Sequence, residues 1–157
     1  TYLGLFYVAV PFSLLNLAVF SVDSVYHYEI LVGCLLILWA SDTGAYFAGT
    51  RFGKTKLFER VSPKKSWEGF LGGAFSALVV AFVLSQYFVV LEDWKWLVIA
   101  GIIIIAGTYG DLIESLFKRS IEIKDSGSVL PGHGGFMDRF DGLLLSAPFI
   151  TAFLKIC

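Results

Sequence analysis

The stretch that decides the fold is KWLVIAGIIIIAGTYGDLIESLF, residues 95–117. Its apolar run is long enough to cross a bilayer, because a spanning α-helix needs about 20 mostly apolar residues. Two carboxylates, Asp111 and Glu114, follow near its end. Ionisable side chains at membrane depth are rare and usually face a polar cavity or a partner. The stretch therefore predicts a membrane-spanning helix with one polar end.

The composition of the whole chain is also that of a membrane protein. Of its 157 residues, 57% are hydrophobic and 16% are charged, whereas a soluble domain carries about 25% charged residues. Apolar runs predict spanning helices at 2–20, 29–50, 67–91, 95–117 and 142–156. We find no internal repeat and no interdomain linker. We therefore expect an all-α integral membrane protein, a bundle of about five transmembrane helices that forms one catalytic domain over residues 1–157.

The basic residues indicate how the bundle is oriented. Segments 51–66 and 118–141 hold ten of the twelve Lys and Arg residues, and segments 21–28 and 92–94 hold none. Cytosolic connections are enriched in Lys and Arg, so both basic segments are expected in the cytosol. Two predicted spans lie between the two basic segments, so both segments must lie on the same side of the membrane, in agreement with this expectation. On the simplest interpretation, these basic residues only set the orientation.

The polar end of the 95–117 span carries its charges on one face. Asp111, Glu114, Ser115 and Lys118 recur at spacings of three and four residues, so they share one helix face. This pattern predicts a polar stripe that faces a cavity open to the cytosol. Alternatively, Asp111 or Glu114 simply forms an ion pair with Lys118 or Arg119. Asp42, in the 29–50 span, offers the same choice between a functional and a structural role.

The start of the third span, RVSPKKSWEG, holds two adjacent lysines. Ser62 and Pro63 suit the N-cap and first position of a helix, or Ser66 is the cap instead. In either case Lys64 and Lys65 lie at a helix N-terminus, where the macrodipole disfavours cations. Their presence there is explained if they bind an anion such as phosphate. The alternative is that they set orientation and contact anionic lipid.

The connection before the last span has the composition of a metal–phosphate site. His133-Gly134-Gly135 can form a tight turn whose backbone approaches a ligand closely. Asp138 and Asp141 follow at a spacing that lets both face one metal ion or substrate, and Arg139 is suited to phosphate. The expected cytosolic mouth of the bundle thus gathers carboxylates and basic side chains: Asp42, Asp111, Asp138, Asp141, Lys64, Lys65, Lys118, Arg119, Lys124 and Arg139.

This composition indicates an enzyme that handles phosphates with Mg²⁺ on the cytosolic face of a membrane. Carboxylates hold the cation, the cation holds phosphate oxygens, and basic side chains neutralise the remaining charge. No serine or cysteine nucleophile is needed, because a phosphate monoester is itself a nucleophile that an enzyme can activate by positioning. The residues alone do not indicate a substrate.

The segment SLFKRSIEIKDSGSVLPGHGGFMDRFD, residues 115–141, resembles the signature of the phosphatidate cytidylyltransferases, or CDP-diglyceride synthases. The matching positions are Ser115, Lys118, Arg119, Lys124, Asp125, Gly127, Pro131, His133, Gly134, Gly135, Asp138, Arg139 and Asp141. Residues 41–46 and 62–69 also resemble this family, although Ser66 stands where many members have Thr. The resemblance covers roughly 39–157. Members usually have further spans before this part, which implies that the chain is the C-terminal portion of a longer protein.

The resemblance implies that CTP and phosphatidate give CDP-diacylglycerol and pyrophosphate, in a Mg²⁺-dependent reaction in which K⁺ accompanies Mg²⁺. It implies a homodimer in the bacterial inner membrane, with its active site on the cytosolic side and no nucleic-acid partner. The metal ligands would be Asp111 and Asp138, with Asp141 a further candidate. The implied catalytic residues are these three with Lys118, Arg119 and His133. The implied substrate-binding residues are Asp42, Lys64, Lys65, Ser66, Ser115, Lys124, Asp125, Gly134, Gly135 and Arg139.

Two of these roles stay open. His133 bonds a phosphate or the leaving pyrophosphate, or it only holds the turn. Asp125 is a second ligand, or it orients Lys124. Two other activities also compete with this interpretation. A CTP-dependent polyprenol or dolichol kinase would need a similar nucleotide site, and a cation channel or transporter would use Asp42 and Asp111 as a pathway. The gathering of polar residues at one face argues against the channel.

Overall fold

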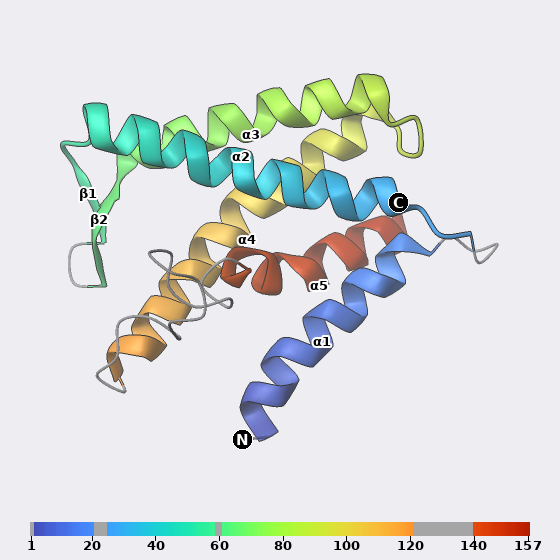
Figure 1. Cartoon of the computed structure of the whole chain (residues 1–157), viewed down its shortest axis with the longest axis horizontal. Coiled ribbons are helices and arrows are strands. Elements are labelled where there is room, and N and C mark those ends of the chain that lie inside the picture. The colour runs from blue at the N-terminus through green and yellow to red at the C-terminus, as the bar shows by residue number, and fades with distance from the viewer. Residues whose placement is uncertain (1, 21–24, 59–60, 121–139) are drawn as a thin grey trace, which may run out of the picture.

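The computed structural model describes residues 2–20, 25–58, 61–120 and 140–157. Most of this part is helical, and a short hairpin connects the second and third helices (Figure 1). The elements are α1 (Tyr2–Val19), α2 (Tyr28–Phe52), β1 (Lys56–Phe58), β2 (Ser62–Ser66), α3 (Trp67–Tyr87), α4 (Asp93–Ser120) and α5 (Asp141–Ile156).

The helices match the five apolar runs of the sequence to within a few residues. Three of them, α2, α3 and α4, are long and apolar enough to cross a membrane. The apolar stretch recognised in α1 covers Phe6–Val19, and α5 has 16 residues. The prediction of a helical membrane protein is therefore supported by three long apolar helices.

Helices α2 and α3 pack closely because small residues face each other along their contact. An ideal Cβ built at Gly73 would lie 2.8 Å from the Ser41 carbonyl oxygen, and one built at Gly69 would lie 3.0 Å from that of Ala45. Small residues allow helix backbones to approach in this way. The two helices consequently form one paired unit, side by side in Figure 1.

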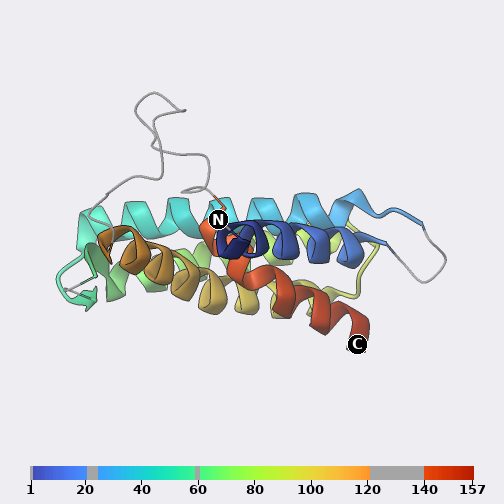
Figure 2. The same cartoon turned by 90° about the horizontal axis from the view of Figure 1, so that it is seen from below.

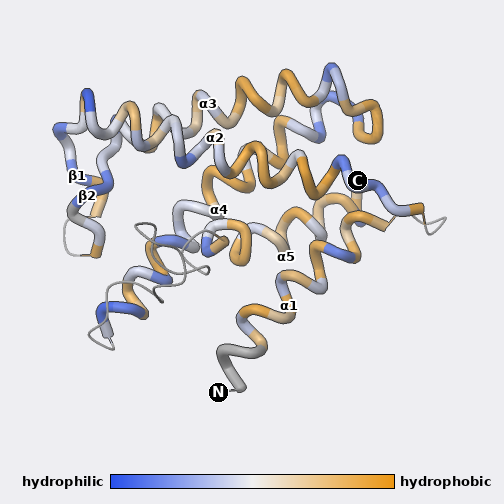
Figure 3. The backbone as a smooth tube through the Cα atoms, viewed as in Figure 1, coloured by the Kyte–Doolittle hydropathy of each residue, from blue (hydrophilic) through white to orange (hydrophobic). Residues whose placement is uncertain are grey.

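The apolar core is centred on α4, which crosses the other helices. Trp96, Ile99 and Ile103 of α4 are 0–1% exposed and pack with Ile37 of α2 and Ile150 of α5. Many large apolar side chains are also exposed, among them Phe75, Phe82 and Ile105, and Figure 3 shows the long hydrophobic stretches of the helices. Large exposed apolar surfaces mark interaction with a membrane or with another protein. Here they occur on the helices that could cross a bilayer.

The all-α prediction needs one correction, which is the β1–β2 hairpin. The strands pair antiparallel, with Lys56 opposite Ser66 and Phe58 opposite Ser62. The predicted helix start at Ser62 is therefore wrong, and the alternative start at Ser66 is confirmed. The Ser66 Oγ accepts a 3.1 Å hydrogen bond from the Gly69 N–H, and the Trp67 N–H donates to the Thr55 carbonyl oxygen. Pairing with the chain that leaves α2 keeps residues 62–66 extended.

The hairpin and the C-terminal end of α4 lie at the same end of the molecule in two perpendicular views (Figures 1 and 2). This end also carries the most continuous hydrophilic colouring (Figure 3). The described parts of the two basic segments therefore share one end, as the distribution of Lys and Arg predicts.

Candidate functional site

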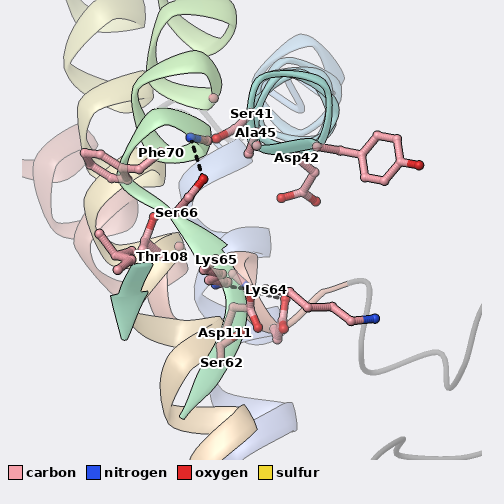
Figure 4. A pocket seen from close by; sticks show the side chains of 18 of the residues that line it. Ser41, Asp42, Ala45, Ser62, Lys64, Lys65, Ser66, Phe70, Thr108 and Asp111 are labelled. Atoms are coloured by element: carbon pink, nitrogen blue, oxygen red, sulfur yellow. Dashed lines mark hydrogen bonds and ion pairs between the residues drawn. The ribbon is translucent and has the colours of Figure 1, made fainter. Parts of the chain in front are cut away.

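A cavity of about 420 Å³ opens between α2, α3, α4, the hairpin and the start of α5. Ser41, Ala45 and Phe70 contribute to its wall beside the charged groups (Figure 4). Seven of the residues that the sequence predicts for the site line this cavity: Asp42, Lys64, Lys65, Ser66, Asp111, Lys118 and Asp141.

An ion pair between the hairpin and α4 forms part of the wall of the cavity. The Lys65 Nζ atom, on β2, contacts the Asp111 Oδ2 atom, on α4. The Ser115 hydroxyl, one turn further along α4, donates a 3.4 Å hydrogen bond to Asp111 Oδ1. Asp111 therefore has a cationic partner from a distant segment of the chain as well as a neighbour on its own helix.

The two adjacent lysines have different surroundings. Because successive side chains of a strand point to opposite faces, Lys65 and Lys64 diverge. The Lys65 side chain is 26% exposed and reaches Asp111, whereas Lys64 is exposed and extends away from that pair (Figure 4). Both lysines lie on β2 in the two positions that precede the Ser66 cap, so they stand just before the N-terminus of α3 and not inside its first turn.

The start of α5 brings another carboxylate to the site. An ideal Cβ at Gly110 would lie 2.7 Å from the Asp141 carbonyl oxygen, so the missing side chain lets α5 begin directly against α4. The Asp141 carboxyl accepts a 2.6 Å hydrogen bond from the Gly142 N–H, and Asp141 lines the cavity together with Asp111. Two helices, α4 and α5, therefore each bring a carboxylate to the same cavity.

Glu114, on α4 three residues after Asp111, is a further acidic side chain and is only 9% exposed. Its Oε1 atom lies 3.6 Å from the Lys118 Nζ atom, which confirms the alternative in which Glu114 pairs with Lys118. The Glu114 Oε2 atom is buried without a hydrogen-bond partner in the described part of the chain. Lys118 also lines the cavity, so its ammonium connects Glu114 to the site.

The described residues are compatible with a bound Mg²⁺ ion but do not form a complete set of ligands. Within residues 2–20, 25–58, 61–120 and 140–157, no group of three or more His, Cys, Asp or Glu side chains is arranged to hold a metal. Mg²⁺ is usually held by one or two carboxylates together with waters and substrate phosphates. Asp111 and Asp141 provide two neighbouring carboxylates, which fits this pattern.

Several predicted site residues cannot be placed by this structure. Lys124, Asp125, His133, Gly134, Gly135, Asp138 and Arg139 lie outside the described residues. Of the others, Arg119 is exposed on the last turn of α4, and Ser115 reaches the site through Asp111.

Several other residues line the cavity without having been predicted for the site, among them Thr108 and Ser62. Thr108 precedes Asp111 by three residues, so the helical spacing that linked Asp111 with Glu114 could have identified it. The sequence analysis considered Ser62 only as a helix cap, and its position in a hairpin had no clear sequence signal.

Comparisons with known proteins agree with the motifs of the sequence. A family model described as the cytidylyltransferase family matches residues 1–157. The phosphatidate cytidylyltransferase of Haemophilus influenzae is 41% identical over 147 residues, covering 88% of this chain and 50% of the relative. Proteins of the same name from Staphylococcus aureus and Staphylococcus epidermidis are 39% and 40% identical over 152 residues, covering 91% of this chain and 58% of each relative. The chain thus spans between half and three fifths of the length of these relatives.

Proposed function

The chain belongs to the cytidylyltransferase family, and on that premise we propose that it forms the CTP-binding and catalytic part of a phosphatidate cytidylyltransferase. The protein would transfer CMP from CTP to phosphatidate, giving CDP-diacylglycerol and pyrophosphate in phospholipid biosynthesis. One observation carries this proposal. A single cavity gathers residues from four separate segments that the resemblance assigns to catalysis or substrate binding: Asp42, Lys65, Asp111 and Asp141.

The proposed reaction needs two phosphates close together. An oxygen of the phosphatidate phosphate attacks the α-phosphorus of CTP, a new P–O–P linkage forms, and the bond to the β-phosphate oxygen breaks. Pyrophosphate leaves with the electron pair of that bond. Lys64, Lys65 and Lys118 line the cavity and would neutralise the phosphates. Positioning and charge neutralisation can account for most of the catalysis of such a transfer.

Mg²⁺ dependence is part of the proposal. Asp111 and Asp138 would hold the ion, with Asp141 as a further ligand and K⁺ as a second cation. Held by these carboxylates, Mg²⁺ would supply positive charge that reduces the repulsion between the two substrates. The neighbouring carboxylates of Asp111 and Asp141 support this assignment.

We further propose that α1 to α5 all cross the membrane, and that the cavity opens to the cytosol. The shared end of the basic hairpin and of α4 supports this orientation, because basic connections favour the cytosolic side. The remaining proposals are a homodimer in the bacterial inner membrane, with CTP, phosphatidate and the bilayer as partners and no nucleic acid. They rest on the family and on its bacterial members.

The test uses the full-length protein in detergent with Mg²⁺, phosphatidate, polyprenol and CTP labelled separately at its α- and γ-phosphates. A cytidylyltransferase places the α label in lipid and releases the γ label as pyrophosphate. Entry of the γ label into lipid would instead identify a lipid kinase. If a folded protein moves neither label, the proposed function is wrong, and ion flux becomes the next measurement.

A further inference from the structure

We propose that Lys65 is an exchangeable counter-ion: its ammonium holds the Asp111 carboxylate while no divalent cation is bound, and it passes to a substrate phosphate when a cation takes Asp111. This inference rests on the proposed function, and it gives the Lys65 ammonium two successive partners. It makes the binding of the cation and of the phosphate interdependent.

The first support is the position of the ion pair. Lys65 and Asp111 meet inside the cavity, and their side chains are 26% and 38% exposed. Each is therefore partly open to the cavity while it touches the other. A divalent cation that binds Asp111 must compete with an ammonium already in contact with the same carboxylate.

The second support is that hydrogen bonds hold the backbone around Lys65, so that only its side chain has to move in the exchange. Ser66, the next residue, caps α3, and the Trp67 N–H donates to the Thr55 carbonyl oxygen at 3.0 Å. The Glu68 carboxylate accepts hydrogen bonds of 3.2 Å from the N–H groups of Lys54 and Thr55. The exchange needs only rotation of a flexible four-carbon side chain, which is characteristic of lysine.

The third support is the contrast with Lys64. This lysine has the same charge and lies one residue away, yet it points away from Asp111 and is exposed (Figure 4). A general basic patch would not distinguish the two residues. Because side chains alternate along a strand, only the Lys65 ammonium of these two lysines reaches the Asp111 carboxylate. The proposed exchange is therefore assigned to Lys65 and not to Lys64.

The exchange has a defined thermodynamic consequence. A cation that releases Lys65 leaves an ammonium available for phosphate, and a phosphate that binds Lys65 leaves Asp111 available for the cation. Coupling between two ligands is reciprocal, so each increases the affinity for the other by the same factor.

The experiment measures Mn²⁺ binding to the full-length protein in detergent by electron paramagnetic resonance, without nucleotide or phosphatidate. Lys65→Met and Lys65→Gln are expected to bind Mn²⁺ at least about tenfold more tightly than the wild type, because a charge within a few ångströms shifts such equilibria by one or more powers of ten. Lys65→Arg keeps the charge and is expected to resemble the wild type. Lys64→Met is the matched control, and its affinity for Mn²⁺ is expected to change less than about twofold, since its side chain points away from the carboxylate.

A second set of variants, made in the Asp111→Asn protein, distinguishes exchange at Asp111 from a general effect of removing a positive charge from the cavity. In Asp111→Asn, removal of Lys65 is expected to give no gain in Mn²⁺ affinity, as a double-mutant cycle requires when the effect passes through that carboxylate. Unchanged or weaker binding in both neutral Lys65 variants overturns the proposal, as does an equal gain in the Asp111→Asn background.

The same preparations are assayed for CMP transfer, which keeps the two proposals apart. Tighter Mn²⁺ binding by the Lys65 variants of a protein that transfers no CMP would support the exchange and reject the function. If the wild type transfers CMP and the neutral Lys65 variants bind Mn²⁺ with the same affinity as the wild type, the function is supported and the exchange is rejected.

Discussion

Gly33 of α2 lies directly against the indole ring of Trp96 of α4. A Cβ built at Gly33 would overlap the ring carbons Cζ3 and Cη2. Trp96 is fully buried, and its Nε1–H donates a 3.3 Å hydrogen bond to the Phe88 carbonyl oxygen. Gly33 therefore sets how closely α2 approaches the largest side chain of the core.

Gly33→Ala should destabilise the bundle. The added methyl group must displace Trp96 or separate α2 from α4, and overpacking of this kind costs about 1–3 kcal/mol. Thermal unfolding in detergent, followed by helical circular dichroism, would show the loss as a lower Tm.

The matched control is Gly101→Ala in α4, where an ideal Cβ would meet no atom within 4 Å in the described part of the chain, apart from the backbone of its own helix and its two neighbours. Alanine is favoured over glycine inside a helix by roughly 0.5–1 kcal/mol, so this variant should be neutral or slightly more stable. Equal loss of stability in both variants would contradict the packing role of Gly33.

Ser76→Ala should weaken the pairing of α2 and α3. The Ser76 hydroxyl donates a 2.7 Å hydrogen bond to the Ala40 carbonyl oxygen across the two helices. A hydrogen bond of this kind contributes about 0.5–1.5 kcal/mol. The loss is measured by thermal unfolding and compared with Ser146→Ala, because Ser146 bonds Leu143 within its own helix. A larger loss for Ser146→Ala would argue against this contribution of Ser76.

Helix positions were predictable from the sequence because a bilayer imposes a length and a hydrophobicity on each span. The runs at 29–50 and 95–117 correspond to α2 and α4 with small shifts at their ends. The β1–β2 hairpin was missed, since Ser62-Pro63 has the local chemistry of a helix start. Hydrogen bonds from the N–H groups of Lys54 and Thr55 to Glu68, at the start of α3, hold this segment as a hairpin. These bonds join residues 13 or 14 positions apart, so the local sequence does not reveal them.

Some of the residues that line the cavity could be predicted from the sequence, but the pairs that they form could not. Helical spacing identified the face that carries Asp111 and Lys118, and both line the cavity. Spacing could not show that Asp111 pairs with Lys65, because that contact depends on how α4 meets the hairpin in three dimensions. Spacing also could not show that Lys65 contacts Asp111 while Lys64 points away from it. That difference arises because residues 62–66 form a strand, whereas the sequence suggested that a helix could start at Ser62.

Glu68→Gln should loosen the connection between α2 and the hairpin. The Glu68 carboxylate accepts hydrogen bonds from the backbone N–H groups of Lys54 and Thr55 at 3.2–3.3 Å. Bonds to a charged acceptor contribute more than bonds to a neutral one, so the neutral amide should raise hydrogen exchange of these two amides by about fivefold or more. Hydrogen–deuterium exchange of a peptide covering residues 53–58 measures the change.

The control for Glu68 is Glu92→Gln, before α4. Glu92 accepts a 2.7 Å hydrogen bond from the Trp94 Nε1–H, and it has no part in the hairpin connection. Its replacement should leave exchange at 53–58 unchanged. If Glu68→Gln also leaves it unchanged, Glu68 does not hold this connection.

Asp111→Asn should abolish most CMP transfer while the bundle stays folded. The amide is similar in size to the carboxylate but cannot neutralise Lys65 or a metal ion, and removing one electrostatic group from such a site lowers the turnover rate by about 100- to 1,000-fold. Transfer of the α label from CTP to phosphatidate measures the rate, and circular dichroism measures the helix content.

Asp93→Asn, at the opposite end of the same helix, removes an exposed carboxylate and should keep near-normal transfer. Near-normal transfer by Asp111→Asn at saturating Mg²⁺ would remove Asp111 from the catalytic site, whereas a parallel loss in Asp93→Asn would show that the assay reports the charge of α4 rather than the cavity.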